Sequence, residues 1–115
     1  MTWDEVGQTA LKTLSAEERR SGALYLDVQE LVPGTTVKID SKEIRVRRKT
    51  AVAFVDREPG VNWGHSARYL LIDLENGEIE SIEAQFPPFL RKVPKTLRLV
   101  WKGESVPDWT VVRPE

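Results

Sequence analysis

The chain contains a single histidine, His65, and acidic side chains lie close to it in the sequence. A histidine can act as a general base when a carboxylate orients its ring, and Asp56 and Glu58 are the nearest candidates. Ser66 follows His65 directly, but neighbouring residues in an extended segment point to opposite sides. A Ser–His pair is therefore not expected, and an enzyme that uses His65 with Asp56 or Glu58 is one hypothesis.

The segment that leads to His65 is also suited to recognition. It reads Gly60-Val61-Asn62-Trp63-Gly64-His65 and combines two flexible glycines with three side chains suited to recognition. Tryptophan is over-represented at binding hot spots, and a tryptophan beside a turn can keep one end in water. The same residues could instead be scaffold, with Trp63 as a buried lid. The predicted binding residues are Asp56, Glu58, Asn62, Trp63, His65 and Arg68.

A small-ligand site is the second hypothesis for this region. Pockets for small ligands are concave and mostly apolar, with a few polar groups that orient the ligand. Trp63, His65, Arg68 and Tyr69 could supply both kinds of side chain at the mouth of a β-barrel or sandwich.

The composition argues against metal and cofactor chemistry. There is no cysteine, which excludes disulfides, thiolate catalysis and cysteine–metal sites. The carboxylates along 73–83 suit calcium or magnesium, but no Asp-x-Asp-x-Asp-Gly loop is present. The chain also lacks a Walker motif and a G-x-G-x-x-G motif. We therefore expect no metal and no cofactor, and we interpret 73–83 as a solvated acidic hairpin.

Net charge and hydropathy argue against nucleic-acid and membrane partners, and the lack of cysteine and of a secretory signal favours a cytoplasmic protein. The net charge is −1, so the basic cluster Arg45, Arg47, Arg48 and Lys49 is a weak signal for nucleic acid, whose binding is not expected. No apolar run approaches the ~20 residues that span a bilayer, and the acidic N-terminus does not resemble a secretory signal. The sequence therefore predicts no membrane association.

Asn76-Gly77 predicts a β-hairpin at the centre of the fold. This dipeptide favours a type I′ turn, in which both central residues have positive φ. A two-residue loop would place Leu74 opposite Ile79 and Asp73 opposite Glu80, and the second pair sets like charges against each other. The predicted core face of this hairpin contains Ala67, Tyr69, Leu71, Ile82, Ala84 and Phe86.

Other local signals predict the remaining elements. Thr2 with Glu5 and Ser15 with Glu18 form capping boxes, which predict two helical segments before residue 22. The four tryptophans divide into Trp3 and Trp101, expected in the core, and Trp63 and Trp109, expected beside turns. Outside the central hairpin, strands are predicted over 24–28, 37–39, 44–55 as one bent strand, 94–102 and 109–112.

These elements predict a mainly β fold that borders on the α+β class. We expect an antiparallel sandwich or partly open barrel of about six or seven strands, with an N-terminal amphipathic helix. One domain is expected over 1–115, with a helical segment over 1–21 and a β-rich body over 23–113. The preferred function is a non-catalytic protein-binding or regulatory module of the inhibitor, immunity or adaptor type. It would use the Gly60–His65 loop and the acidic hairpin 73–83.

Overall fold

The computed structural model describes residues 1–61, 64–88 and 92–114. This part of the chain forms two helices, seven strands and a short 3-10 helix. In chain order they are α1 (Trp3–Leu11), α2 (Ala16–Ser21), β1 (Ala23–Leu31), β2 (Thr36–Ile39), β3 (Lys42–Arg45), β4 (Thr50–Asp56), β5 (Ala67–Asp73), β6 (Ile79–Ala84), β7 (Leu97–Lys102) and η1 (Asp108–Thr110).

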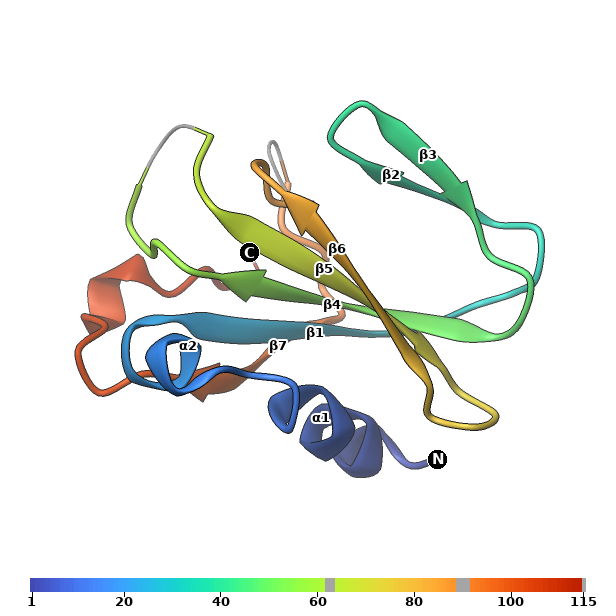
Figure 1. Cartoon of the computed structure of the whole chain (residues 1–115), viewed down its shortest axis with the longest axis horizontal. Helices are drawn as coiled ribbons and strands as arrows, with labels where there is room; N and C mark the ends of the chain where they lie inside the picture. Colours follow the sequence, from blue (N-terminus) through green and yellow to red (C-terminus); the bar gives the residue numbers. More distant parts are fainter. Residues whose placement is uncertain (62–63, 89–91, 115) are drawn as a thin grey trace.

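Five of the strands form one antiparallel sheet with the order β6-β5-β4-β1-β7, and β2 pairs with β3 in a separate ribbon. The predicted mainly β, antiparallel fold with a helical N-terminus is confirmed. Within the described residues the sheet does not close into a barrel, because β6 and β7 remain its two edges. Figure 1 shows the helices on one side of this sheet and the β2–β3 ribbon on the other.

Each face of the sheet has its own apolar core. Val6, Ala10 and Leu14 pack from the helical segment against one face, and Ile39 packs from the ribbon against the other. Burial from both sides explains why Tyr69–Ile72 is apolar at every position, as expected for a strand in the interior of a sheet. The helix-side face carries Leu24, Leu26, Ala51, Ala53, Val55, Leu70 and Ile72, and the ribbon-side face carries Ala23, Tyr25, Phe54, Ala67, Tyr69, Ala84 and Leu97.

Both predicted capping boxes are present. The Glu5 amide donates to Thr2 Oγ1 at 3.2 Å, and the Thr2 amide donates to Glu5 Oε1 at 2.8 Å. Ser15 and Glu18 repeat this exchange at 3.1 and 2.9 Å. Each box satisfies amides that the first turn of a helix leaves without partners, so these local sequences fix where α1 and α2 begin.

The register predicted for the central hairpin is wrong by two residues. Ile72, not Leu74, lies opposite Ile79, and the Asp73 amide donates to the Glu78 carbonyl at 2.8 Å. The Asp73 carboxylate accepts hydrogen bonds from the amides of Glu75 and Asn76. Of the two residues Asn76 and Gly77, only Gly77 has positive φ. This side-chain acceptor favours a wider turn over type I′. The predicted opposition of Asp73 and Glu80 is therefore absent.

Several other elements also differ from the prediction. Residues 46–49 interrupt the expected strand over 44–55, and η1 replaces the strand expected at 109–112. Trp3 and Phe86 were expected in the core but are 37 % and 41 % exposed. Trp101 is half-buried as its Nε1 donates to the Arg19 carbonyl at 2.7 Å.

Candidate functional site

His65 and Asp56, which the sequence proposed as partners, meet at the neck of the loop between β4 and β5. His65 Nε2 lies 2.8 Å from Asp56 Oδ1, and the His65 ring is only 6 % exposed. The same carboxylate oxygen accepts the Glu58 amide at 2.9 Å, and the His65 amide donates to the Gln85 carbonyl at 2.8 Å. His65 therefore ties the loop to the ends of β4 and β6.

Glu58 closes the neck of the loop from the other side. Its Oε2 accepts the Ser66 amide at 3.0 Å, and its carbonyl accepts the Val61 amide at 3.2 Å. The side chain of Ser66 does not face His65 but accepts a hydrogen bond from Arg57 Nη1 at 3.0 Å. Asp56 and Glu58 thus brace a loop whose end carries Gly60. Asn62 and Trp63, two predicted binding residues, lie outside the described residues.

Trp109 lies against this loop and is the most exposed large apolar side chain among the described residues, at 77 %. A Cβ built on Gly60 would lie 3.2 Å from Trp109 Cη2 and 3.0 Å from Thr110 Cγ2. Gly60 also has φ +92, which other residues rarely adopt. We call the surface formed by Gly60, Trp109 and Thr110 the Gly60–Trp109 surface.

The segment that carries Trp109 is fixed on both sides. Before it, the Lys102 ammonium contacts Asp108, and this hydrogen bond lowers the pKa of the Asp108 carboxyl below its ordinary value. After it, the Val112 amide donates to the Tyr25 hydroxyl at 2.9 Å. Trp109 is therefore an exposed aromatic side chain on an ordered backbone, which limits the conformational entropy lost when it binds a partner.

Arg68 and Tyr69 do not share a pocket mouth with His65. They are neighbours in β5 and point to opposite faces of the sheet. Arg68 is 7 % exposed on the helix side, whereas Tyr69 is 2 % exposed on the ribbon side and donates to the Phe86 carbonyl at 2.9 Å. Burial raises the pKa of the Tyr69 hydroxyl. The residues proposed to surround a small ligand are thus divided between the two faces.

The position of Arg68 is explained by a buried ion pair with Glu18 of α2. Arg68 Nε and Nη2 donate to the two carboxylate oxygens of Glu18, each at 2.9 Å, and Nη2 also donates to the Thr13 carbonyl at 3.0 Å. Arg57 Nε donates to Glu18 Oε2 at 2.9 Å and its other nitrogens hold Glu83. This network joins α2, β5 and β6 to the braced loop, and it was not predicted from the sequence.

The Glu18 network makes stability depend on pH in a defined window. Burial alone would raise the pKa of Glu18, but hydrogen bonds from Arg68, the Ser15 amide and Arg57 outweigh it and lower that pKa from 4.5 to about 2. A carboxyl with a lowered pKa stabilises the fold above its ordinary pKa, and this contribution is lost as pH falls from 4.5 towards 2. We expect a loss of at most about 3 kcal/mol, measured by urea unfolding across this range.

Glu18→Gln is the control for this prediction. The glutamine side chain cannot titrate. The difference in unfolding free energy between wild type and variant should therefore become smaller as the pH falls below 4.5, the ordinary pKa of the carboxyl. A difference that stays constant through the window would contradict the prediction.

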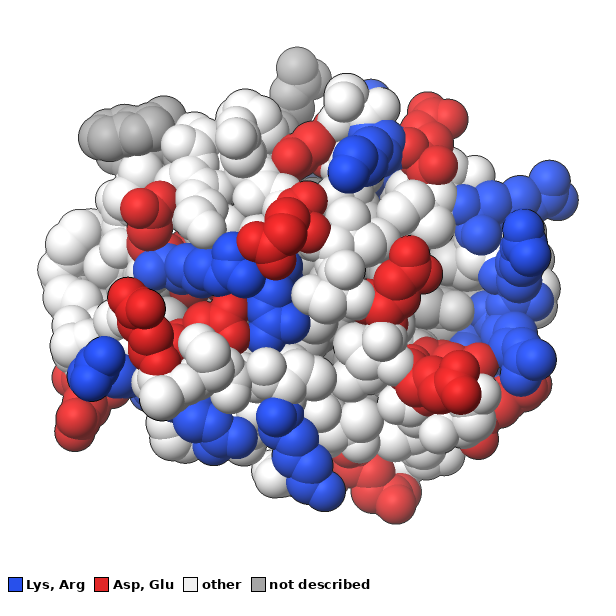
Figure 2. Space-filling view, viewed as in Figure 1, with Lys and Arg blue, Asp and Glu red and all other residues white. Residues whose placement is uncertain are grey.

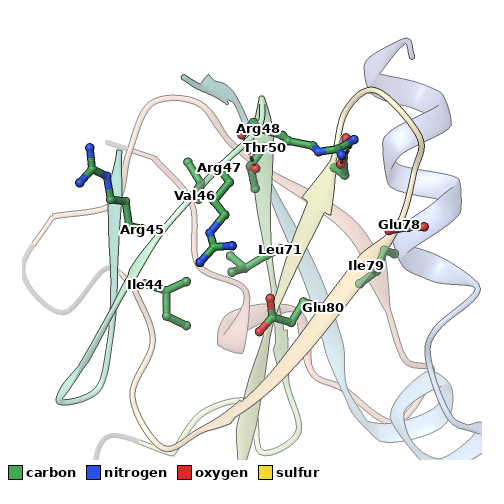
Figure 3. A pocket seen from close by; sticks show the side chains of 11 residues that line it. Ile44, Arg45, Val46, Arg47, Arg48, Thr50, Leu71, Glu78, Ile79 and Glu80 are labelled. Atoms are coloured by element: carbon green, nitrogen blue, oxygen red, sulfur yellow. Dashed lines mark hydrogen bonds and ion pairs between the residues drawn. The ribbon is translucent and has the colours of Figure 1, made fainter. Parts of the chain in front are cut away.

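The basic cluster does not form a uniform basic face. Arg45, Arg47 and Arg48 line a groove of about 600 Å³ together with the acidic residues Glu78 and Glu80. Figure 3 shows Arg47 and Glu80 extending towards the groove, with Leu71 between them. Arg48 lies 3.8 Å from Asp73. Figure 2 shows Lys and Arg side chains gathered at the right-hand edge of the molecule, and both signs of charge interspersed over the rest of that face.

His65 also lines a hollow of about 480 Å³, together with Asp40, Ser66 and Glu83. The arrangement brings a histidine and a carboxylate together, as the enzyme hypothesis requires. However, the ring nitrogen that meets Asp56 lies at the closed neck of the loop and the ring is buried. The geometry is that of a brace between backbone segments.

The described residues contain no group of three or more histidine, cysteine, aspartate or glutamate side chains placed to hold a metal ion. In the same part of the chain, no helix combines the length and apolar character needed to cross a membrane. No family model, no curated protein and no solved structure matches this chain.

Proposed function

We propose that this protein is a non-catalytic protein-binding module, of the inhibitor, immunity or adaptor type, whose contact surface is the Gly60–Trp109 surface. The observation that carries the proposal is Trp109, a large aromatic side chain that is 77 % exposed although its backbone is fixed on both sides. Exposed aromatic anchors of this kind are typical of binding hot spots. We also propose that the protein is cytoplasmic and that its partner is another protein.

The hydrogen bonds at the two ends of the loop support this proposal. Asp56, Glu58 and His65 use their polar atoms to hold the described ends of the loop together, beside the Gly60–Trp109 surface. A rigid surface loses less entropy on binding than a flexible one. Among the predicted binding residues, these three side chains therefore act as a brace for the segment that contains Gly60. Arg68 contributes indirectly, because its ion pair with Glu18 helps to position Arg57 and the loop.

The proposal is tested by affinity capture from a lysate of the source organism with immobilised wild type and Trp109→Ala. We expect wild type to retain a discrete protein that Trp109→Ala loses, with a drop of at least about tenfold in affinity once that protein is purified. Trp109→Ala removes an exposed side chain, so the fold should be unaffected, and circular dichroism checks this.

Trp3→Ala is the matched control, because Trp3 is also partly exposed but lies on α1. It should retain the same protein as wild type. Identical sets of captured proteins from wild type and Trp109→Ala would contradict the proposal.

A further inference from the structure

We infer that two copies of this chain associate through the outer side of β6 and form one continuous antiparallel sheet. The strand β6 is an edge of the five-stranded sheet and pairs only with β5 among the described residues. Figure 1 shows β6 in front of β5 and β4. The inference uses residues outside the Gly60–Trp109 surface, so it can fail without affecting the proposed function.

The register with β5 determines which backbone groups of β6 are available. In an antiparallel pair, the hydrogen-bonded residues alternate along each strand. The Asp73 amide donates to the Glu78 carbonyl, so the even-numbered residues of β6 direct their backbone groups towards β5. Ile79, Ser81 and Glu83 therefore direct theirs away from the sheet. We call these three residues the β6 edge.

The β6 edge has defined ends. The next outward amide is that of Gln85, and Asp40 Oδ2 accepts it at 2.9 Å while Asp40 Oδ1 accepts the Phe86 amide at 3.1 Å. At the other end, the chain enters the turn that begins at Asp73. The turn of the β2–β3 ribbon thus closes one end of the edge and leaves the length between Ile79 and Glu83 available.

The opposite edge of the sheet is protected in a way that β6 is not. The register between β1 and β7 shifts between Leu24 and Tyr25, so the outward groups of β7 do not alternate regularly. Bulges and basic side chains are common devices against edge-to-edge pairing, and β7 has both, with Arg98 and Lys102. The ladder between β5 and β6 is regular over its whole length. A second strand can therefore add to β6 without distortion.

One register satisfies the whole β6 edge of both copies. With Ser81 opposite Ser81 of the second copy, Ile79 lies opposite Glu83 of the second copy, and each chain uses all three outward residues. Three hydrogen-bonded pairs supply about six backbone hydrogen bonds. A shift by two residues in one direction sets Glu80 against Glu80 of the second copy, which is unfavourable. The opposite shift leaves Ile79 facing Gln85, whose amide Asp40 already holds.

The charges are compatible with this register. Glu83 is already paired with Arg57, so its place opposite Ile79 adds no unpaired charge. Glu80 lies opposite Ile82 of the second copy and remains beside the groove that Arg47 lines. No like charges face each other, and the two copies are related by a twofold axis through Ser81, as in most homodimers.

Sedimentation analysis between micromolar and millimolar concentration tests the inference with Ser81→Pro and Ser81→Ala. Both variants lose the hydroxyl that accepts a hydrogen bond from Arg68, but only proline removes the outward amide. We expect wild type and Ser81→Ala to dimerise with rising concentration and Ser81→Pro to remain a monomer. A monomeric wild type at millimolar concentration, or a Ser81→Pro variant that dimerises like Ser81→Ala, would overturn the inference.

A cysteine variant provides a second test that does not depend on how Ser81→Pro folds. The chain has no cysteine, so Ser81→Cys can form only a disulfide between two copies. Opposed residues of a hydrogen-bonded pair have Cα atoms roughly 5.5 Å apart, which a disulfide can span. Ser41→Cys, at an exposed turn, is the control. Ser81→Cys should cross-link much faster than Ser41→Cys, and equal rates would overturn the inference.

Discussion

Arg68→Ala is expected to destabilise the protein by about 3–5 kcal/mol, because it removes the main partner of a buried carboxylate. Arg68 joins β5 to Glu18 of α2, to the Thr13 carbonyl and to Ser81 Oγ of β6, and Arg68 and Glu18 are both buried residues, each 7 % exposed. Alanine leaves Glu18 in a buried site with only Arg57 as a charged partner. Urea unfolding at neutral pH measures the loss as a lower midpoint at an unchanged slope.

Arg57→Ala is the comparison for Arg68→Ala. Arg57 also reaches Glu18, but its side chain is 29 % exposed and its other partner, Glu83, is 69 % exposed. Exposed ion pairs contribute little, so we expect a loss nearer about 1 kcal/mol. The cost of Glu18→Ala and Arg68→Ala together should be smaller than the sum of the single costs, since neither charge is then left without the other. An Arg68→Ala loss no larger than that of Arg57→Ala would contradict the buried ion pair.

Gly103→Ala is expected to destabilise the protein by more than about 3 kcal/mol, because no side chain fits at this position. A Cβ built on Gly103 would lie 2.2 Å from the Arg20 carbonyl oxygen. Because this oxygen belongs to the backbone, it cannot move aside as the end of a flexible side chain could. The Gly103 amide also donates to the Gly22 carbonyl at 2.9 Å, which joins the end of β7 to the end of α2. A methyl group at residue 103 must separate these segments. Thermal unfolding followed by circular dichroism measures the effect.

Gly7→Ala is the control, with an effect of the opposite sign. A Cβ on Gly7 meets Val100 Cγ1 at 3.7 Å, which is an ordinary contact. Because Gly7 lies inside α1, alanine should stabilise the helix by up to about 1 kcal/mol. If Gly103→Ala proves as stable as wild type, the close approach of α2 to the end of β7 is wrong.

Local signals in the sequence identified most of the elements but not the register of the central hairpin. The capping boxes at Thr2 and Ser15 fix the helices because every atom involved lies within three residues. Alternation of apolar residues identified most strands and the faces of β5. The turn after β5 was mispredicted because the Asp73 carboxylate competes with the turn preference of Asn76-Gly77, and the sequence does not rank these two effects.

The candidate site was predicted less completely than the fold. Asp56 and His65 are close in the sequence, and the structure brings them together. Arg68 and Glu18 are fifty positions apart, and no local pattern indicates that they pair. A strand was predicted over 109–112, yet Trp109 belongs to η1 and its ring is exposed beside Gly60. Contacts between distant segments decide both positions.

The central claim is that the Gly60–Trp109 surface contacts a protein partner, and photo-cross-linking tests it most directly. A photoreactive p-benzoylphenylalanine in place of Trp109 should yield a discrete covalent adduct in lysate of the source organism. The same probe in place of Val32, which is 58 % exposed in the segment after β1, should not yield that adduct. The same adducts from both positions, or none from residue 109, would contradict the claim.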